Sequence, residues 1–263
     1  MEVIIRPTTE SAVRLTARLI ADAIIEQPNI VLGLATGRTM EAVYAELVKM
    51  YQAGELDFSL VRSFNLDEYI GLAGDNKNSY RYYMNHHLFD HINIDKRNTS
   101  LPNGVAEDPK AECARYEWAI RAAGGVGLQL LGIGRDGHIG FNEPLSSLAS
   151  RTRAKALTPE TYEQNSPLFD NPEEMPKRAF TMGVGTILDS KRIIMLVTGA
   201  EKAEILARAV EGPVTAMVSA SAMQLHPNVV VIADEAAAAK LQEREYCDWI
   251  FANEPEWEKY RDL

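Results

Sequence analysis

Cysteine is scarce in this chain: Cys113 and Cys247 are the only two in 263 residues. Two cysteines cannot build a disulfide framework, so the expected compartment is the reducing cytoplasm. No apolar run approaches the roughly 20 residues that span a bilayer, and the opening MEVIIRP is too short and too acidic for a signal peptide. These absences predict a cytoplasmic protein without a membrane partner.

Basic residues are also in deficit. The chain has 27 lysines and arginines against 37 acidic residues, a formal charge of -10. This balance argues against a nucleic-acid or anionic-membrane surface, since both require a basic face. Apolar residues make up 46%, enough for a core, and the length predicts a single domain over residues 1–263.

Short apolar runs alternate with helical patterns along most of the chain. We expect strands near 3–5, 30–35, 61–66, 128–133, 193–198 and 229–232, and helices near 13–24, 40–51, 79–89, 109–122 and from about 202. Because these strands are apolar without alternation, they predict an α/β fold with a mostly parallel sheet covered on both faces. Ligands bind beyond the carboxyl ends of such strands, here after residues 35, 66, 133 and 198.

Two segments depart from this rhythm. Residues 159–178 hold four prolines, and a long loop of this kind is either a functional lid or a passive surface excursion. The tail from about residue 253 is polar and acidic, and we expect it either to fray or to contact another subunit.

The segment Thr36-Gly37-Arg38-Thr39 lies between a buried strand and an amphipathic helix. Unpaired amides at the start of that helix attract an anion, and Arg38 adds a fixed charge, which predicts a phosphate site. The alternative is an ordinary turn with Thr39 as the helix cap. Lys202 follows another strand and could reach the same phosphate, or could be an exposed helix lysine.

Two adjacent carboxylates, Asp67 and Glu68, follow the strand near 61–66. Neighbouring strand residues face opposite ways, so only one of them would enter a cleft, where burial could make it a general base. Taken alone, the pair is more often a solvated acidic turn.

The run from Gly132 to Pro144, GIGRDGHIGFNEP, contains a literal G-x-G-x-x-G after a strand. A dinucleotide fingerprint also needs a helix there and an acid about 20 residues later, and both are missing. The glycines instead predict a tight loop that gathers Asp136, His138 and Glu143 as an acid–base group. The competing interpretation is a structural histidine.

Metal and thiol chemistry have weaker support. His87 and His91 are four residues apart, but the segment HLFDH lacks the glutamate of H-E-x-x-H and no cysteine cluster is present. Cys113 has no histidine nearby in the sequence. We therefore expect no metal site and no cysteine nucleophile.

Taken together, the motifs LATGRT, FNLDEYIGL, LLGIGRDGHIGFNEP, SSLASRTR, TMGVGTIL and ASAMQLHP resemble those of the glucosamine-6-phosphate deaminase family, in the same order and up to about residue 235. The resemblance implies a modified Rossmann-like fold with an active-site lid. It implies a hydrolase or isomerase that converts glucosamine 6-phosphate and water to fructose 6-phosphate and ammonia without a cofactor.

The resemblance also implies residue roles. Asp67 would move a proton between C2 and C1, and the group of Asp136, His138 and Glu143 would open the sugar ring. Better-known members have glycine and proline where this chain has Arg38 and Met40, and a lid arginine where this chain has Pro167. Arg38 could replace the charge of that missing arginine.

Some hexameric members are activated by N-acetylglucosamine 6-phosphate at a subunit interface. The matching positions are Ser146, Arg153 and Lys155, with Tyr246 as a counterpart from a neighbouring subunit. The resemblance therefore implies a homo-oligomer, with a hexamer and an effector site as further expectations; a basic strand face is the alternative for Arg153 and Lys155.

Four rival functions remain open. A 6-phosphogluconolactonase has a related fold, and a relative could prefer galactosamine 6-phosphate. A nicotinamide oxidoreductase would bind a dinucleotide. A sugar-phosphate sensor would bind without turnover, but this chain keeps every acid–base residue of the motifs.

Overall fold

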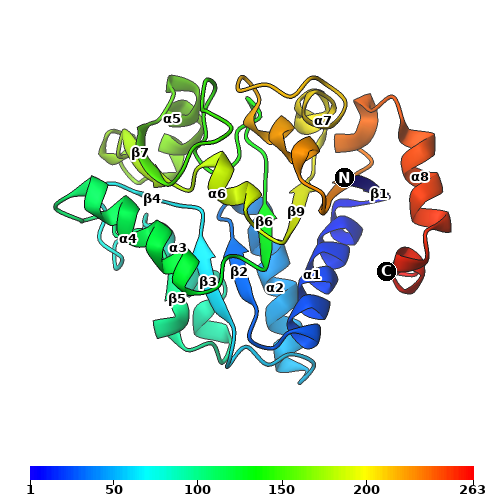
Figure 1. Ribbon diagram of the computed structural model, residues 1–263, viewed down its shortest axis with the longest axis horizontal. Helices are drawn as coiled ribbons and strands as arrows, with labels where there is room; N and C mark the ends of the chain where they lie inside the picture. The colour runs from blue at the N-terminus through cyan, green and yellow to red at the C-terminus, as the bar shows by residue number, and fades with distance from the viewer.

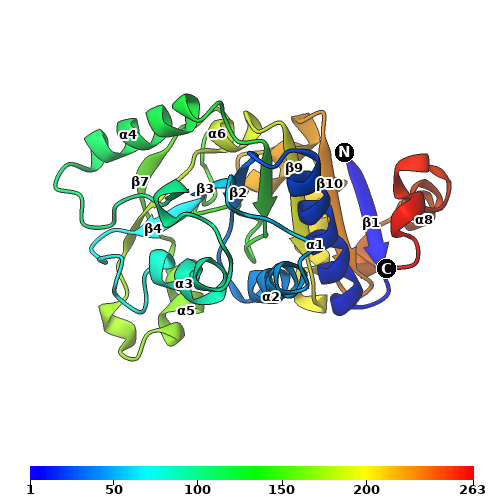
Figure 2. The same ribbon diagram turned by 90° about the horizontal axis from the view of Figure 1, so that it is seen from below.

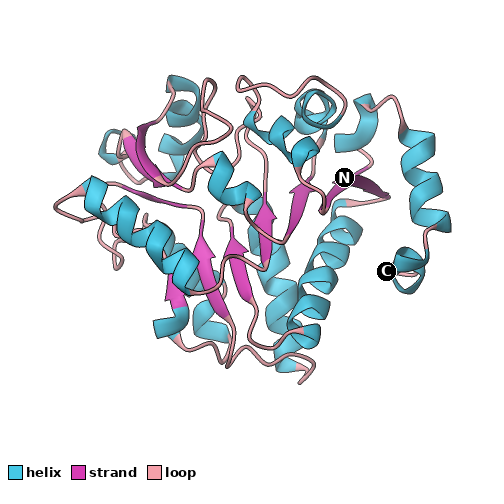
Figure 3. Ribbon diagram, viewed as in Figure 1, coloured by secondary structure: helices cyan, strands magenta, loops and turns pink.

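The computed structural model describes all residues from 1 to 263. Its centre is a seven-stranded sheet in which all strand pairs are parallel (Figures 1 and 3). In spatial order the strands are β1 (Glu2–Arg6), β10 (Val229–Asp234), β9 (Arg192–Val197), β6 (Leu128–Leu131), β2 (Val31–Leu34), β3 (Arg62–Asn65) and β5 (Thr99–Ser100). The predicted mostly parallel α/β fold is confirmed.

Helices cover both faces of this sheet (Figure 2). One face carries α1 (Thr9–Glu26), α2 (Arg38–Gln52) and α3 (Tyr80–His87), and the other carries α4 (Pro109–Ala122) and α6 (Val184–Leu188). The inner strands are apolar along their whole length because both faces are covered: every residue of β2, β6 and β10 is buried.

The sheet contains a point where the strand order reverses, between β2 and β6. From β2 the chain continues to β3 and β5 on one side, whereas β6, β9 and β10 extend the sheet on the other. Connections that diverge in this way leave a crevice beyond the carboxyl ends of the two strands. Helix α7 (Ala203–Val210) and helix α5 (Pro159–Asn165) lie beyond these ends (Figure 1).

A second, three-stranded antiparallel sheet was not predicted. It has the order β4 (Asp67–Tyr69), β8 (Arg178–Thr181), β7 (Arg153–Ala156). Its strands are too short to show a period, and β7 (RAKA) exposes two of its four residues. Only the pairing with β8 makes Asp67 part of a strand, opposite Thr181.

The segment 159–178 is more regular than a loop. It forms α5 and 3-10 turns at Ser166–Leu168 and Pro172–Glu174, each with a proline at its first or second position. Phe169 and Met175 are buried in a small apolar cluster with Tyr69 and Phe141. The segment therefore packs against the rest of the molecule rather than projecting from it.

The expectation that the tail frays is wrong, because it packs on the rest of the chain; a contact with another subunit stays a prediction. Helix α8 (Arg244–Asn253) packs beside β1, and the 3-10 turn Pro255–Tyr260 follows it. Trp257 and Tyr260 are buried, and Asp22 of α1 accepts hydrogen bonds from Tyr260 (2.7 Å) and Lys259 (2.8 Å). No helix is long and apolar enough to cross a membrane.

Candidate active site

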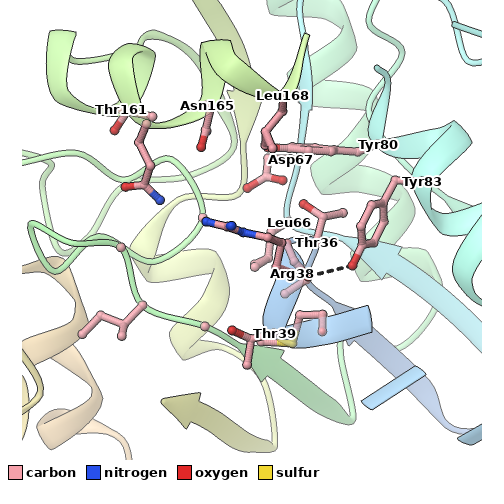
Figure 4. A pocket seen from close by; sticks show the side chains of 18 of the residues that line it. Thr36, Arg38, Thr39, Leu66, Asp67, Tyr80, Tyr83, Thr161, Asn165 and Leu168 are labelled. Carbon is pink, nitrogen blue, oxygen red and sulfur yellow. Dashed lines mark hydrogen bonds between the residues drawn. The ribbon is translucent and has the colours of Figure 1, made fainter. Parts of the chain in front are cut away.

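A cavity of about 680 Å³ opens beyond the carboxyl ends of the central strands. Its wall includes residues that follow four strands: Ala35–Glu41 after β2, Leu66 and Asp67 after β3, Gly132–Arg135 after β6, and Thr198 and Gly199 after β9. These are the four strand ends expected from the sequence. From the opposite side, α5 and the turn after it contribute Thr161, Asn165 and Leu168 (Figure 4).

The predicted anion-binding residues meet at one side of this cavity. Thr36, Gly37, Arg38, Thr39 and Lys202 all line it. Helix α2 begins after Gly37 (φ 115°) and has no side-chain cap, so its first amides, at the positive end of the helix dipole, have no side-chain acceptor at the cap position. The alternative of a Thr39 cap is thereby excluded.

Two further hydrogen bonds hold this anion-binding side in place. The Tyr83 hydroxyl donates to the Gly37 carbonyl oxygen (2.8 Å; Figure 4), and Lys202 Nζ donates to the Ile133 carbonyl oxygen (2.8 Å). Lys202 thus reaches across from the β9 connection to the β6 connection. Each of the two bonds therefore fixes one side of the crevice where a phosphate would bind.

Asp67 presents a buried carboxylate to the same cavity (Figure 4). Burial and the neighbouring Glu68 carboxylate raise its pKa to about 8, while the charge of His138 acts in the opposite direction. A carboxylate with a raised pKa holds a proton near neutral pH more firmly than an ordinary aspartate, which suits a group that must take up and return one.

Glu68 faces away from the cavity, as strand alternation predicts. Its carboxylate accepts hydrogen bonds from the backbone amides of Tyr69 (2.9 Å), Tyr80 (3.0 Å) and Arg81 (2.9 Å). It therefore fixes the start of α3, the helix that carries the cavity residues Tyr80 and Tyr83. The sequence had given this residue no structural role.

His138 lies between two carboxylates. Its Nδ1 atom is 2.7 Å from Asp136 Oδ1 and 3.2 Å from Glu143 Oε2. Burial alone would lower the imidazole pKa, but hydrogen bonds and charge from the two acids outweigh it and raise the pKa to about 9. Burial acts to raise the pKa of Asp136, and the hydrogen bond and charge of His138 instead bring it down to about 2.

Only two of the four predicted acid–base residues line the cavity: Asp67 and His138. Asp136 and Glu143 lie behind the imidazole, and the backbone amide of Thr158, the residue before α5, donates to Glu143 Oε1 (3.3 Å). The predicted acid–base group of Asp136, His138 and Glu143 does come together, but its two acids contact His138 and do not line the cavity.

The same three side chains could in principle hold a metal ion, since their ligand atoms lie within 4.8 Å of one another. The residue types are compatible with a divalent metal. Both carboxylates approach the same imidazole nitrogen, Nδ1 of His138, where the charge of a protonated imidazole offsets theirs. His87 lies 4.0 Å from Glu41, and His91 contacts the His86 carbonyl oxygen, so these two histidines form no ligand pair.

The proposed effector residues occupy two separate regions. Arg153 donates to Ser146 Oγ (2.9 Å) and to Asn142 Oδ1 (2.8 Å), next to Glu143. Lys155 is exposed on β7, and Tyr246 is exposed on α8 at the opposite end of the molecule (Figure 1). Within one chain Tyr246 does not reach the other three.

Several cavity residues escaped the sequence reasoning. They are Tyr80 and Tyr83 on α3, Gln164 and Asn165 on α5, and Arg135 in the loop after β6. The two tyrosines had been assigned only to a helix, and the α5 residues only to a possible lid. Arg135, inside the quoted loop motif, was the one position where a charge at a strand end could have been noticed.

Most of the chain is similar in sequence to known proteins. The family model of glucosamine-6-phosphate isomerases/6-phosphogluconolactonase matches residues 7–232. A glucosamine-6-phosphate deaminase from Hahella chejuensis is 51% identical over 250 residues, covering 95% of each chain. One from Cellvibrio japonicus is 52% identical over 246 residues, covering 94% of each.

Solved structures agree with these sequence matches. A monomeric glucosamine-6-phosphate deaminase superposes with a TM-score of 0.89 at 44% identity, covering 91% of this chain and 100% of the other. A 6-phosphogluconolactonase from Trypanosoma cruzi reaches a TM-score of 0.72 at 18% identity, covering 92% and 97%. At that identity the second likeness concerns the fold alone.

The carboxylates behind His138 make a testable electrostatic prediction. In Asp136→Asn the imidazolium loses a charged partner, so the pKa of His138 should fall from about 9 toward its ordinary value near 6.5. NMR titration of the imidazole resonances measures this directly. Asp189→Asn, which removes an exposed carboxylate paired with Arg151, is the matched control, and an equal shift in both variants would contradict the assignment.

Proposed function

The chain belongs to the glucosamine-6-phosphate isomerase/6-phosphogluconolactonase family, and we propose that it is a glucosamine-6-phosphate deaminase. The reaction converts glucosamine 6-phosphate and water to fructose 6-phosphate and ammonia. The observation that carries the proposal is the meeting of Asp67 and His138 in one cavity whose other side is an uncapped helix start. Proteins of this name share 51–52% of their residues with this chain and match 94–95% of its length.

Ring opening is the first chemical step. The pyranose opens when its ring oxygen gains a proton and its anomeric hydroxyl loses one. His138, protonated below a pKa of about 9, supplies the first proton and can take the second from the same position. Asp136 and Glu143 hold the imidazole in place and keep its charged form available.

Isomerisation follows at Asp67. Its carboxylate removes the proton at C2 of the open aldehyde form, and the resulting enolamine takes a proton at C1. The C2–N bond is then an iminium, which water attacks at C2, and ammonia leaves as the C2 ketone forms. The carbon skeleton is thus isomerised, and water cleaves the C2–N bond with release of ammonia, so the reaction couples an isomerisation to a deamination.

The phosphate anchors the substrate far from the reacting carbons. The uncapped amides of α2, together with Arg38 and Lys202, offer a positive surface in a chain of charge -10. Binding energy from such a remote group orients the reacting end. Thr36 and Thr39 add hydroxyl groups beside these amides (Figure 4).

We assign the lid to the segment 159–178. It places Thr161, Asn165 and Leu168 over the cavity and is secured by Phe169 in the small apolar cluster. An exposed ion pair between Asp170 and Lys77 joins it to the opposite wall. Covering the cavity shields the enolamine from water until the C1 proton has been delivered.

The alternatives have less support. The solved 6-phosphogluconolactonases resemble this chain at only 18–20% identity, and a lactonase would not need a carboxylate placed for abstraction at C2. Galactosamine 6-phosphate differs only at C4, and the preferred epimer, the homo-oligomer and the N-acetylglucosamine 6-phosphate effector stay predictions. The 44%-identical structure is described as monomeric.

Replacing the proposed base tests the mechanism. Asp67→Asn should lower ammonia release by at least 10²–10⁴-fold, the usual worth of general base catalysis, while a substrate analogue still binds. Ammonia and fructose 6-phosphate are measured with glucosamine, galactosamine and N-acetylated hexosamine 6-phosphates as substrates, and Asp189→Asn, outside the cavity, is the control. Near-native turnover by Asp67→Asn would refute the role of this residue.

The raised pKa of Asp67 predicts an acidic limb in the rate profile. The base is active only when ionised, so below a pKa of about 8 in the free enzyme kcat/KM should fall by about tenfold per pH unit. Because the Glu68 charge contributes to that pKa, Glu68→Gln should move the limb to lower pH. A limb near pH 4 in the parent enzyme, as for an exposed aspartate, would contradict the assignment.

Arg38 should contribute to phosphate binding. A charge-assisted hydrogen bond contributes about 1.5–3 kcal/mol, so Arg38→Ala should raise the KM for glucosamine 6-phosphate by about ten- to a hundredfold. Steady-state kinetics at fixed ionic strength measure the effect, with Arg14→Ala on α1 as an exposed control. An unchanged KM would mean that this arginine stays in solvent when substrate binds.

A further inference from the structure

We propose that Arg135 is a further phosphate-binding residue and a determinant of specificity for phosphorylated sugars, acting beside Lys202. The inference rests on the proposed function, because it names how the same cavity holds its substrate. Neither the glycine-rich loop motif nor the acid–base assignment uses this arginine.

The loop after β6 aims consecutive residues in different directions. The amide of Gly137 donates to the Gly134 carbonyl oxygen (3.1 Å), and the amide of Gly134 donates to the His138 carbonyl oxygen (2.8 Å), which closes a tight turn. Asp136 folds back inside this turn, where its carboxylate accepts from the His138 amide (3.1 Å). Arg135 is exposed on the outside of the turn and lines the cavity.

Lys202 is a second cation of the same cavity, and a hydrogen bond fixes its position. Its ammonium is bound to the carbonyl oxygen of Ile133, two residues before Arg135. Burial lowers the pKa of Lys202, and the positive charge of Arg135 lowers it further, whereas Glu201 opposes both effects. The two cations are therefore close enough to repel each other, which an anion bound between them would relieve.

Three of the four lysines and arginines that line the cavity lack an acidic partner within the chain. Arg38, Arg135 and Lys202 form no ion pair, whereas many cations on the surface of this acidic chain do. The acids that line the cavity are Glu41, Asp67 and Glu201. Glu41 lies 4.0 Å from the imidazole of His87, and Asp67 belongs to the reacting end.

The lid offers no positive charge to the ligand. Its cavity-lining residues are Thr161, Gln164, Asn165, Leu168 and Phe169, all uncharged. Lys77 on the facing wall is paired with Asp170. A phosphate dianion must therefore be neutralised by groups at the strand ends, and Arg135, with a planar fork of donors, suits phosphate oxygens better than a lysine would.

The location of Arg135 has a mechanistic consequence. The arginine that contacts the phosphate and the histidine that opens the ring belong to one short turn, so the distance between the two ends of the substrate is set by this turn. Loss of the arginine should weaken binding much more than it slows chemistry.

The test compares Arg135→Gln with Arg208→Gln, an exposed arginine on α7 that does not line the cavity. Two measurements are made at fixed ionic strength: the affinity for inorganic phosphate by calorimetry, and kcat and KM for glucosamine 6-phosphate. We expect Arg135→Gln to weaken phosphate affinity and raise KM by about ten- to a hundredfold, with a much smaller change in kcat. Arg135→Lys should recover part of the affinity, and Arg208→Gln should behave as the parent.

The outcomes separate the two proposals. Parental phosphate affinity and KM in Arg135→Gln would overturn the role of Arg135, and so would a parent protein that binds no phosphate. If the parent binds phosphate through Arg135 but releases no ammonia from any hexosamine 6-phosphate, the inference survives and the proposed function fails. If Arg135→Gln does not fold, a parental phosphate affinity in Arg135→Ala or an undiminished affinity in Arg135→Glu would overturn it in the same way.

Discussion

Parallel pairing of the central strands is the constraint on which the site depends. Register between β2, β6 and β9 brings three connections to one edge of the sheet, although they are distant in sequence. The first supplies the uncapped start of α2, the second the turn with Arg135 and His138, and the third Lys202. Since the strand order reverses between β2 and β6, these connections diverge and leave room for a ligand between them.

The cavity divides into two electrostatic ends. At one end, helix amides and unpaired cations form a surface for an anion; at the other, a buried carboxylate faces an imidazolium. Burial favours the neutral form of both titrating groups, so it raises the pKa of Asp67 and lowers the pKa of His138. Only the acids behind the histidine keep the imidazole charged. This difference in surroundings lets one group hold and return a proton at carbon while the other serves the ring oxygen.

The small antiparallel sheet connects the lid to the reacting end. Its strand β4 carries Asp67, and its strand β8 follows the lid in the chain. Thr181 on β8 pairs opposite Asp67. Glu143 and the amide of Thr158 add a direct link between the histidine group and the base of α5. The lid is therefore connected to the surroundings of both proton-transferring groups, Asp67 and His138.

The sequence by itself determined the parallel sheet, the strand ends that carry function and the loop motif around His138, because unbroken apolar runs and closely spaced glycines act locally. It also indicated that one of Asp67 and Glu68 would face a cleft, from strand alternation alone. Only the tertiary structure decided that Asp136 and Glu143 lie behind the imidazole and that Glu68 accepts hydrogen bonds from the first amides of α3. It also decided that Arg135 and Lys202 line one cavity and that the tail packs on Asp22. These relations join residues through pairing and packing between distant segments, and no local period or spacing encodes them.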